Sequence, residues 1–381
     1  MVITKIISAH MPWYLRRALK NERAVKFNGQ QVVNTFMPPF PSLAFERLIK
    51  KSLDINHHRT DLYSAHIALT NKCGFNCWHC SSAHRQGKEI TAYRWIEVIK
   101  ELQDMGISII GFTGGEPLRR KDLETIIKSI DTRSTSILFT TGEGLDNDRA
   151  KRLKTAGLYY IVISLDHYDE KEHNRLRGSD RAFATAINAI KTSIKNNFYT
   201  ATQLTVRKNI TNFKFLYKYL NFAGSLGAQE IRIGEPMPTG RLINEKRDIF
   251  LSEKDRDVLK KFHREANRDN SLPKVTAFAY IEDRKLYGCC GGIYHIYIDA
   301  FGNVCPCDFT PISFGNIHKE TFKNVFQRLR GRFTSPRAKC FMLDNIDTLR
   351  PIFEKNLPLS YDISRGLCAD CSGGNLPLAF L

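Results

Sequence analysis

Short apolar runs alternate with amphipathic segments between residues 64 and 236, and this alternation constrains the fold more than any other feature of the chain. We expect strands at residues 64–70, 107–113, 134–142, 158–166, 200–206 and 228–236. The segments between them have helical spacing. In residues 91–106, for example, Thr91 is a suitable N-cap and Gly106 is suited to end the helix. Single apolar runs joined by helices predict an α/β fold with a parallel sheet that curves into a partial (β/α)6 barrel.

The loops that follow five of these strands are rich in glycine, cysteine and polar residues. They contain the sequences TNKC, TGGEP, TTGEG, SLDH and GEPMPTG. In sheets of this kind the carboxyl ends of the strands meet at one rim, where binding and catalytic residues are concentrated. Five such loops therefore predict that the functional site lies at this rim.

The ten cysteines fall into two groups. Three lie between residues 73 and 80, none lies between 81 and 288, and seven lie between 289 and 371. The chain has no run of about 18 apolar residues. Because its first residues also lack the pattern of a secretion signal, we expect a cytoplasmic protein. In that compartment, clustered cysteines indicate metal or redox chemistry more than disulfides.

The first group, Cys73, Cys77 and Cys80, has the spacing C-x3-C-x2-C directly after the first predicted strand. Three thiolates can hold three irons of a [4Fe–4S] cluster and leave the fourth iron open to another ligand. The alternative is a zinc site whose fourth ligand comes from elsewhere in the chain.

Together with the sequence GGEP at Gly114–Pro117, this spacing resembles the radical S-adenosylmethionine (SAM) superfamily over residues 61–245. The resemblance implies that the open iron binds SAM, and that an electron from the reduced cluster cleaves SAM to a 5′-deoxyadenosyl radical. This radical then abstracts a hydrogen atom from the substrate. The SAM-binding residues that the resemblance implies are His79, Gly114, Gly115, Glu116 and Ser164. Arg177, in the sequence RLRG, is a further candidate.

The second group resembles the SPASM extension of radical SAM enzymes. It begins with Cys289 and Cys290 and continues with Gly302-x4-Cys307. Only ten residues follow Cys371, so the pattern is closest to the shortened twitch form of the extension. This form implies a small, cysteine-rich C-terminal domain with one auxiliary [4Fe–4S] cluster.

The ligands that we assign to this cluster are Cys290 (or Cys289), Cys307, Cys368 and Cys371. Cys305 and Cys340 then remain without a ligand role, although either can replace one of the four. Four protein ligands would saturate the cluster, which would relay electrons or stabilise the domain rather than bind substrate. A structural zinc site with the same thiolates is the alternative.

We expect four parts in the chain: an N-terminal extension at 1–60, the barrel at 61–245, a helical connector at 246–285 and the auxiliary-cluster domain at 286–381. Short strands are expected after the connector, at residues 274–280, 291–299 and 302–308.

The formal net charge is +18, and residues 1–60 carry ten Lys or Arg against three Asp or Glu. Such a charge favours anionic partners. Segment 6–20 is consistent with a short basic amphipathic helix that either lies on an anionic membrane surface, as a peripheral contact, or docks on the barrel. The proline-rich stretch 36–42 indicates an extended linker.

These patterns predict a radical SAM oxidoreductase or maturase that modifies a peptide or a small molecule, with the auxiliary cluster relaying electrons in a net oxidation. The resemblance implies a flavodoxin- or ferredoxin-type electron donor. A lipid substrate at the membrane surface is one alternative. The other is a metal-stabilised basic protein that binds nucleic acid, which the cysteine motifs disfavour.

Glu235, in the last rim loop, is the residue that we assign to catalysis. Arg232, Arg241 and His167 are further candidates for substrate contacts, although each of these residues is also consistent with a surface ion pair. His66 lies within the first predicted strand, and we expect it to be a hydrogen-bonded histidine of the core.

Overall fold

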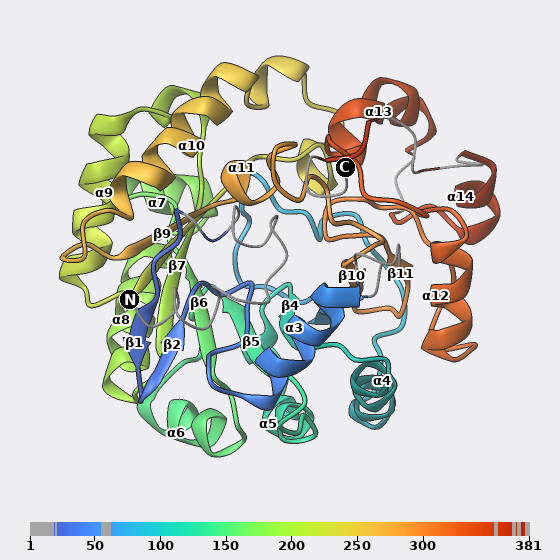
Figure 1. Ribbon diagram of the computed structural model, residues 1–381, viewed down its shortest axis with the longest axis horizontal. Helices are drawn as coiled ribbons and strands as arrows, with labels where there is room; N and C mark the ends of the chain where they lie inside the picture. The colour runs from blue at the N-terminus through green and yellow to red at the C-terminus, as the bar shows by residue number, and fades with distance from the viewer. Residues whose placement is uncertain are drawn as a thin grey trace.

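The computed structural model describes residues 19, 21–54, 62–353, 357–367, 371 and 375–377. Among these residues, the centre is a nine-stranded sheet with the order β11-β10-β3-β4-β5-β6-β7-β8-β9. Its strands are β3 (Ser64–Thr70), β4 (Ile109–Gly114), β5 (Thr135–Thr140), β6 (Tyr160–Ser164), β7 (Tyr199–Thr205), β8 (Glu230–Gly234), β9 (Lys274–Ala277), β10 (His295–Ile298) and β11 (Val304–Cys305). The predicted parallel strands are β3 to β8, and each pairs with the next in the chain. The sheet curves into a partial barrel surrounded by helices (Figure 1).

Helices connect these strands on the outer face of the sheet. They are α4 (Ala92–Asp104), α5 (Leu123–Lys128), α6 (Asn147–Thr155), α7 (Glu170–Arg177), α8 (Ala182–Lys195), α9 (Phe213–Ser225) and α10 (Glu253–Ala266). Helix α4 begins at the predicted cap, because the side chain of Thr91 accepts a hydrogen bond from the amide of Arg94. Ile99 and Leu102 of α4 are fully buried in the main core, and each contributes about 1.5–3 kcal/mol by its burial.

The cysteine-rich C-terminal region continues the same sheet. Strand β10 pairs in parallel with β3, and β11 pairs antiparallel with β10. At the other edge, β9 pairs in parallel with β8. The expected strand at 274–280 is wrong in its second half, where the chain turns into the helix α11 (Phe278–Ile281). The helices that follow are α12 (Phe322–Arg330), α13 (Phe341–Leu349) and α14 (Tyr361–Leu367).

The N-terminal extension covers the amino ends of the barrel strands. It forms a hairpin of β1 (Val25–Phe27) and β2 (Gln30–Val32), followed by helix α3 (Leu43–Asp54). Phe27 and Val32 pack in one apolar cluster with Tyr160 and Tyr199, the first residues of β6 and β7. The barrel is therefore open to ligands at the opposite end, where the rim loops lie.

The stretch 36–42, the expected extended linker, joins β2 to α3 and is packed, since Phe40 exchanges backbone hydrogen bonds of 2.7 and 2.8 Å with Gln31. The helix expected within residues 6–20 lies outside the described residues except for Leu19. None of the described helices combines the length and the apolar character that crossing a bilayer requires.

Candidate active site

A cavity of about 330 Å³ lies inside the barrel. Thr113, Ser164 and Gly234, which lie at the carboxyl ends of β4, β6 and β8, line it, so it is at the predicted rim. Cysteines from both sequence groups also belong to its wall: Cys77, Cys80, Cys289, Cys290, Cys307 and Cys340. Two regions that are far apart in the chain therefore face one space.

The loop that carries the first three cysteines provides a set of thiols suited to a metal cluster. Cys73 is exposed and accepts a hydrogen bond of 3.4 Å on its sulfur from the amide of Phe75, whereas Cys77 is buried. Although Cys73 is exposed, neighbouring protein atoms partly desolvate its thiol and raise its pKa to about 11, and burial raises the pKa of Cys77. Both groups therefore favour the protonated thiol unless a cation is bound. A metal cluster supplies that positive charge, so these residues fit the expected cofactor.

Arg177 connects this loop to a buried carboxylate. Its Nη1 lies 3.6 Å from Sγ of Cys77, and its Nε lies 2.7 Å from Oδ2 of Asp166. Burial raises the pKa of Asp166, but the charge of Arg177 outweighs this effect and the pKa is lowered. This role of Asp166, which follows Ser164 by two residues, was not predicted from the sequence. These contacts of Arg177 hold the end of α7 against the cysteine loop. In addition, the amide of Asn76 in this loop donates a hydrogen bond of 2.9 Å to the carbonyl of Arg177.

His79 and Ser164, two of the expected SAM-binding residues, both line the cavity. Nδ1 of His79 lies 3.9 Å from Oδ2 of Asp166. Burial lowers the pKa of His79 to about 4, so its imidazole is neutral at physiological pH. It can therefore offer one donor and one acceptor to a bound nucleotide.

The two glycines of GGEP allow strand β4 to lie directly against the cysteine loop. Gly114 has φ of 139°, and a Cβ atom on it would be 2.2 Å from the carbonyl oxygen of Thr70. A Cβ atom on Gly115 would be 2.4 Å from the carbonyl oxygen of Lys72. Both glycines line the cavity, so their exposed backbone leaves room for a ligand beside the cysteines.

Glu116, by contrast, is fully buried and its carboxylate is already engaged. It accepts hydrogen bonds from the hydroxyl of Thr140 at 2.6 Å, and from both the amide and the hydroxyl of Thr141 at 2.7 and 2.6 Å. It also accepts one from the amide of Leu118 at 3.0 Å. The structure thus shows Glu116 joining the loops after β4 and β5. Its direct contact with SAM stays a prediction.

The auxiliary cysteines come together from three segments. Cys289 and Cys290 precede β10, Cys307 follows β11, and Cys340 directly precedes α13. A hydrogen bond from the Cys340 thiol lowers the pKa of Cys289. Sγ of Cys307 lies 3.1 Å from the hydroxyl of Thr310. The thiol of Cys340, which sequence reasoning left without a role, is therefore part of this group. Because Cys340 is isolated among the cysteines of the chain, no spacing pattern pointed to it.

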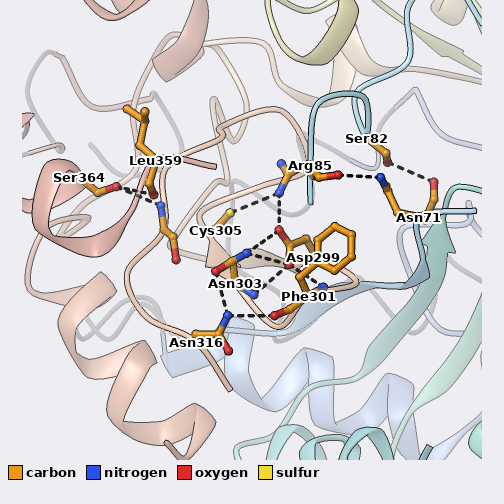
Figure 2. Close-up of polar contacts among 12 residues, drawn as sticks. Asn71, Ser82, Arg85, Asp299, Phe301, Asn303, Cys305, Asn316, Leu359 and Ser364 are labelled. Carbon is orange, nitrogen blue, oxygen red and sulfur yellow. Dashed lines mark hydrogen bonds and ion pairs between the residues drawn. The ribbon is translucent and has the colours of Figure 1, made fainter. Parts of the chain in front are cut away.

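Cys305 lies beside Arg85 and Asp299, as Figure 2 shows. Its sulfur lies 3.9 Å from Nη1 of Arg85, which also binds Oδ2 of Asp299 at 3.0 Å. Cys305 does not line the cavity, and burial raises its pKa to about 12. The contact joins the segment after Cys80 to the β10–β11 hairpin and gives Cys305 a structural environment.

The remaining expected ligands are Cys368 and Cys371. Cys368 lies outside the described residues. Cys371 is buried and disulfide-bonded. A ligand role for Cys371 therefore requires reduction of that bond.

Beside Cys307, two histidines share one carboxylate. Nδ1 of His66 lies 2.9 Å from Oδ1 of Asp308, and Nε2 of His295 lies 2.8 Å from Oδ2. The expectation that His66 is hydrogen-bonded is confirmed. The expected location in the core is wrong, because the ring of His66 lines the cavity. Gly111 makes this possible, since a Cβ atom there would lie 2.4 Å from Cδ2 of His66.

Arg232 also lines the cavity, and it is a buried cation rather than a surface residue. Its Nε donates to Oε1 of Gln203 at 3.0 Å, and its Nη1 donates to the hydroxyl of Thr35. Its guanidinium carbon lies 4.3 Å from the ring centre of Phe36. Burial lowers its pKa to about 10. The N-terminal extension thus contributes directly to the cavity.

Glu235 lies directly after β8 and lines the cavity, as expected for a residue near the substrate. Oε1 lies 3.7 Å from Arg256, and burial raises the pKa of Glu235 above its ordinary value. His167 is not brought to the cavity. Its Nδ1 accepts a hydrogen bond from the amide of Asp169 at 2.9 Å, and its ring packs against Phe215.

Two family models match the two regions of the chain that carry the cysteines of this site. Residues 67–215 match the sequence model of the radical SAM superfamily, and residues 289–372 match the iron–sulfur cluster-binding domain SPASM. The chain therefore contains one region of the radical SAM type and one region of the SPASM type. Radical SAM domains carry a [4Fe–4S] cluster and SAM, and SPASM domains carry auxiliary iron–sulfur clusters, so these are the cofactors of this protein.

Among curated proteins, the chain is similar to the AdoMet-dependent heme synthase of Methanosarcina barkeri. The two are 26% identical over 286 residues, which cover 68% of this chain and 80% of the heme synthase. Among solved structures it is similar to Streptococcus suis SuiB bound to the precursor peptide SuiA. That match has a TM-score of 0.60 and 15% identity, and covers 74% of this chain and 69% of SuiB.

A further match is anSMEcpe with bound AdoMet, with a TM-score of 0.55 and 18% identity, covering 69% of this chain and 80% of anSMEcpe. At these identities the two structures show that the fold is shared, and they confirm the α/β architecture with a mostly parallel sheet.

Proposed function

We propose that this protein cleaves SAM reductively at a cluster held by Cys73, Cys77 and Cys80, and that it modifies a peptide or small molecule in a net oxidation. The bound cluster and SAM supply a 5′-deoxyadenosyl radical that can remove a hydrogen atom from an unactivated carbon. The observation that carries the proposal is the single cavity of about 330 Å³ whose wall contains cysteines of both groups.

On the SAM side of this cavity, each residue has a distinct task. Gly114 and Gly115 let β4 pack directly against the backbone of the cysteine loop. His79 and Ser164 offer neutral polar groups to the nucleotide and the methionine portion of SAM. Arg177 binds Cys77 and Asp166, which fixes the loop in place. Glu116 supports the same loop through its hydrogen bonds to Thr140 and Thr141.

For the auxiliary cluster, we propose ligands from the cysteines that share the cavity: Cys289, Cys290, Cys307 and Cys340. The assignment of Cys368 and Cys371 from spacing remains the alternative ligand pair. A cluster at this position would accept the second electron of the oxidation. We assign the accompanying proton to Glu235, because its carboxylate lines the cavity and its pKa is raised by burial.

The volume of the cavity is in the range of sites for a small molecule or for one or two side chains of a peptide. The match to SuiB with its bound precursor peptide supports a peptide, and the match to heme synthase supports a small molecule. A flavodoxin- or ferredoxin-type protein would supply the electron. The described part of the N-terminal extension packs on the barrel, so we assign it no membrane contact.

An anaerobic assay of the reconstituted protein tests this function. We expect brown protein with about eight irons if two [4Fe–4S] clusters are present, and formation of 5′-deoxyadenosine when SAM and dithionite are added. Cys73→Ala should abolish 5′-deoxyadenosine formation. Colourless protein that binds nucleic acid with a steep dependence on salt would refute the proposal.

A further inference from the structure

Arg232 is a buried cation on the wall of the cavity, and it has no carboxylate in direct contact among the residues that the structure describes. It belongs to β8 and is only 2% exposed. Nε donates to Gln203 and Nη1 donates to the hydroxyl of Thr35, whereas Nη2 has no acceptor within the described part of the chain. Buried charges are normally paired, because an uncompensated charge in a protein interior is costly.

Two carboxylates act electrostatically on Arg232, but both are bound to other groups. Glu230 accepts hydrogen bonds from the amide and the hydroxyl of Thr35 at 3.1 and 3.0 Å, and from the hydroxyl of Tyr199 at 3.2 Å. The hydroxyl of Thr35 therefore lies between Glu230 and the guanidinium. Asp308 is held by two imidazoles. The pKa of Arg232 is lowered to about 10 by burial, so the group is still charged at physiological pH.

Three phenylalanine rings surround this cation. The guanidinium carbon lies 4.3 Å from the ring centre of Phe36, 5.1 Å from that of Phe139 and 5.2 Å from that of Phe278. All three residues line the cavity. The rings stabilise the cation through their faces, and they keep its surroundings apolar. In such surroundings the attraction between the cation and an anionic ligand is stronger than in water.

Gln203 provides a second donor beside the guanidinium. Its Oε1 accepts the hydrogen bond from Arg232, and its Nε2 donates to the carbonyl of Leu204 at 3.5 Å, which is the upper limit of a hydrogen bond. Gly234 leaves room for this amide, since a Cβ atom on Gly234 would lie 2.8 Å from Nε2. Gln203 and Gly234 both line the cavity. One anionic oxygen atom in the cavity can therefore accept hydrogen bonds from a charged and a neutral donor.

The charge of the site suits a singly charged ligand. Among the described residues, Arg177 and Arg232 are the arginines that line the cavity, and no lysine lines it. Arg177 is already paired with Asp166. One available cation matches a carboxylate, whereas a doubly charged phosphate group would require further cations or a row of backbone amides.

We propose that Arg232 and Gln203 bind a carboxylate of the substrate, so that the substrate is a small carboxylic acid or an acidic peptide. The proposal rests on the proposed function and narrows its substrate class. The carboxylate accepts hydrogen bonds from Nη2 of Arg232 and from the amide of Gln203, and no covalent bond changes at this position. The phenylalanine rings contact the apolar carbons next to the carboxylate.

The test measures binding of defined probes to the reconstituted holoenzyme, which is saturated with SAM and kept oxidised so that no SAM is cleaved. One probe pair is hydrocinnamate and its neutral amide. The other is an acetylated and amidated dipeptide of phenylalanine and glutamate, with glutamine in place of glutamate in its neutral partner. Calorimetry gives the dissociation constants for the wild type, Arg232→Met and Arg232→Lys. The control variant is Lys191→Met, which removes one exposed positive charge on α8.

In the wild type we expect at least one acid to bind about tenfold or more tightly than its amide, because hydrogen bonds to charged groups are the stronger ones. Arg232→Met should abolish this preference and leave the affinity for the amides unchanged. Arg232→Lys, which keeps the charge and loses the planar fork, should retain part of it. Lys191→Met should bind all probes as the wild type does. The pair with the larger preference shows whether the carboxylate belongs to a small acid or to a peptide side chain.

Equal affinities of the wild type for each acid and its amide would overturn the proposal without reference to any variant. An acid preference that persists in Arg232→Met would also overturn it. The affinity for SAM is measured separately, without probes. A fall in that affinity in Arg232→Met as large as the fall for the acids would show that Arg232 binds the carboxylate of SAM and not that of the substrate. The proposed function fails independently, if the wild type forms no 5′-deoxyadenosine with SAM and dithionite.

Discussion

The two cysteine regions face the same cavity but are built in different ways. In the first, one short loop provides all three thiols, and an arginine ties the loop to the buried Asp166. In the second, the cysteines come from segments before β10, after β11 and before α13, and the nearby Asp308 is bound by two histidines. A site made by one loop can be recognised from spacing, whereas a site assembled by tertiary contacts depends on the fold.

The largest expected effect distinguishes the two possible ligand sets of the second region. We expect Cys340→Ala to lose the auxiliary cluster, with iron falling from about eight to about four per chain. Cys305→Ala should keep both clusters, because Cys305 lies beside Arg85 and not on the cavity wall. Iron and sulfide analysis and electron paramagnetic resonance of the anaerobic protein measure the difference.

Cys371→Ala completes this comparison. If it removes the auxiliary cluster and Cys340→Ala does not, the ligand assignment from spacing is correct and the one from the cavity wall is wrong. In either case the cluster on Cys73, Cys77 and Cys80 should remain, with SAM cleavage at or near the wild-type rate. Loss of that activity together with the auxiliary iron would show that the two regions do not fold independently around their metals.

The next largest effect is expected from two aspartates, the buried Asp166 and the partly buried Asp308. Asp166→Asn leaves the buried guanidinium of Arg177 without its ion pair, and removal of one partner of such a pair costs about 3–5 kcal/mol. Asp308→Asn removes the acceptor of two imidazoles and leaves no buried guanidinium unpaired, so we expect a smaller loss of about 1–3 kcal/mol. Denaturant unfolding of the two variants gives these values. A loss for Asp308→Asn as large as that for Asp166→Asn would contradict this ranking.

The difference between the one-loop region and the region assembled from distant segments also explains how much of the fold and the site could be predicted from the sequence. The strands β3 to β8, the cap at Thr91 and the convergence of the rim loops follow from local periodicity and are confirmed. The positions of Cys340, Asp308 and His66 on one wall depend on pairing between β10 and β3, which are more than 200 residues apart. Short apolar runs do not specify which distant strand they join, so this part of the site could not be read from spacing.

A pH effect in the first region is expected from His173, which is buried and accepts a hydrogen bond from the amide of Asp166 at 3.1 Å. Burial lowers its pKa from 6.5 to about 4 in the folded protein. Between these values the unfolded chain binds more protons, so stability is fully present above pH 6.5 and falls as the pH drops toward 4. The loss for this residue is about 3 kcal/mol.

His173→Gln should remove this part of the pH dependence. Glutamine can still accept the hydrogen bond from Asp166, and it does not titrate. His79, whose pKa is also lowered to about 4, titrates in the same range. The variant should therefore show a smaller loss between pH 6.5 and 4, while His79 and the other histidines of lowered pKa keep the rest, as measured by urea unfolding at each pH. An unchanged pH dependence of the free energy of unfolding would mean that water reaches His173 before it is protonated, so that its pKa in the folded protein is not lowered.

The smallest expected effect compares one glycine from each region. In Gly115→Ala the new methyl group meets backbone atoms, 2.4 Å from the carbonyl oxygen of Lys72 and 2.7 Å from the carbonyl carbon of Asn71. The cysteine loop must move to admit it, and such overpacking costs about 1–3 kcal/mol. In Gly291→Ala the nearest atom is Cβ of Cys307 at 3.4 Å, which is ordinary contact, so we expect a change within about 0.5 kcal/mol. Thermal unfolding of the two holoenzyme variants measures the difference. Equal shifts would contradict the inference that the first region is held rigidly by close backbone contact while the second retains space around its cysteines.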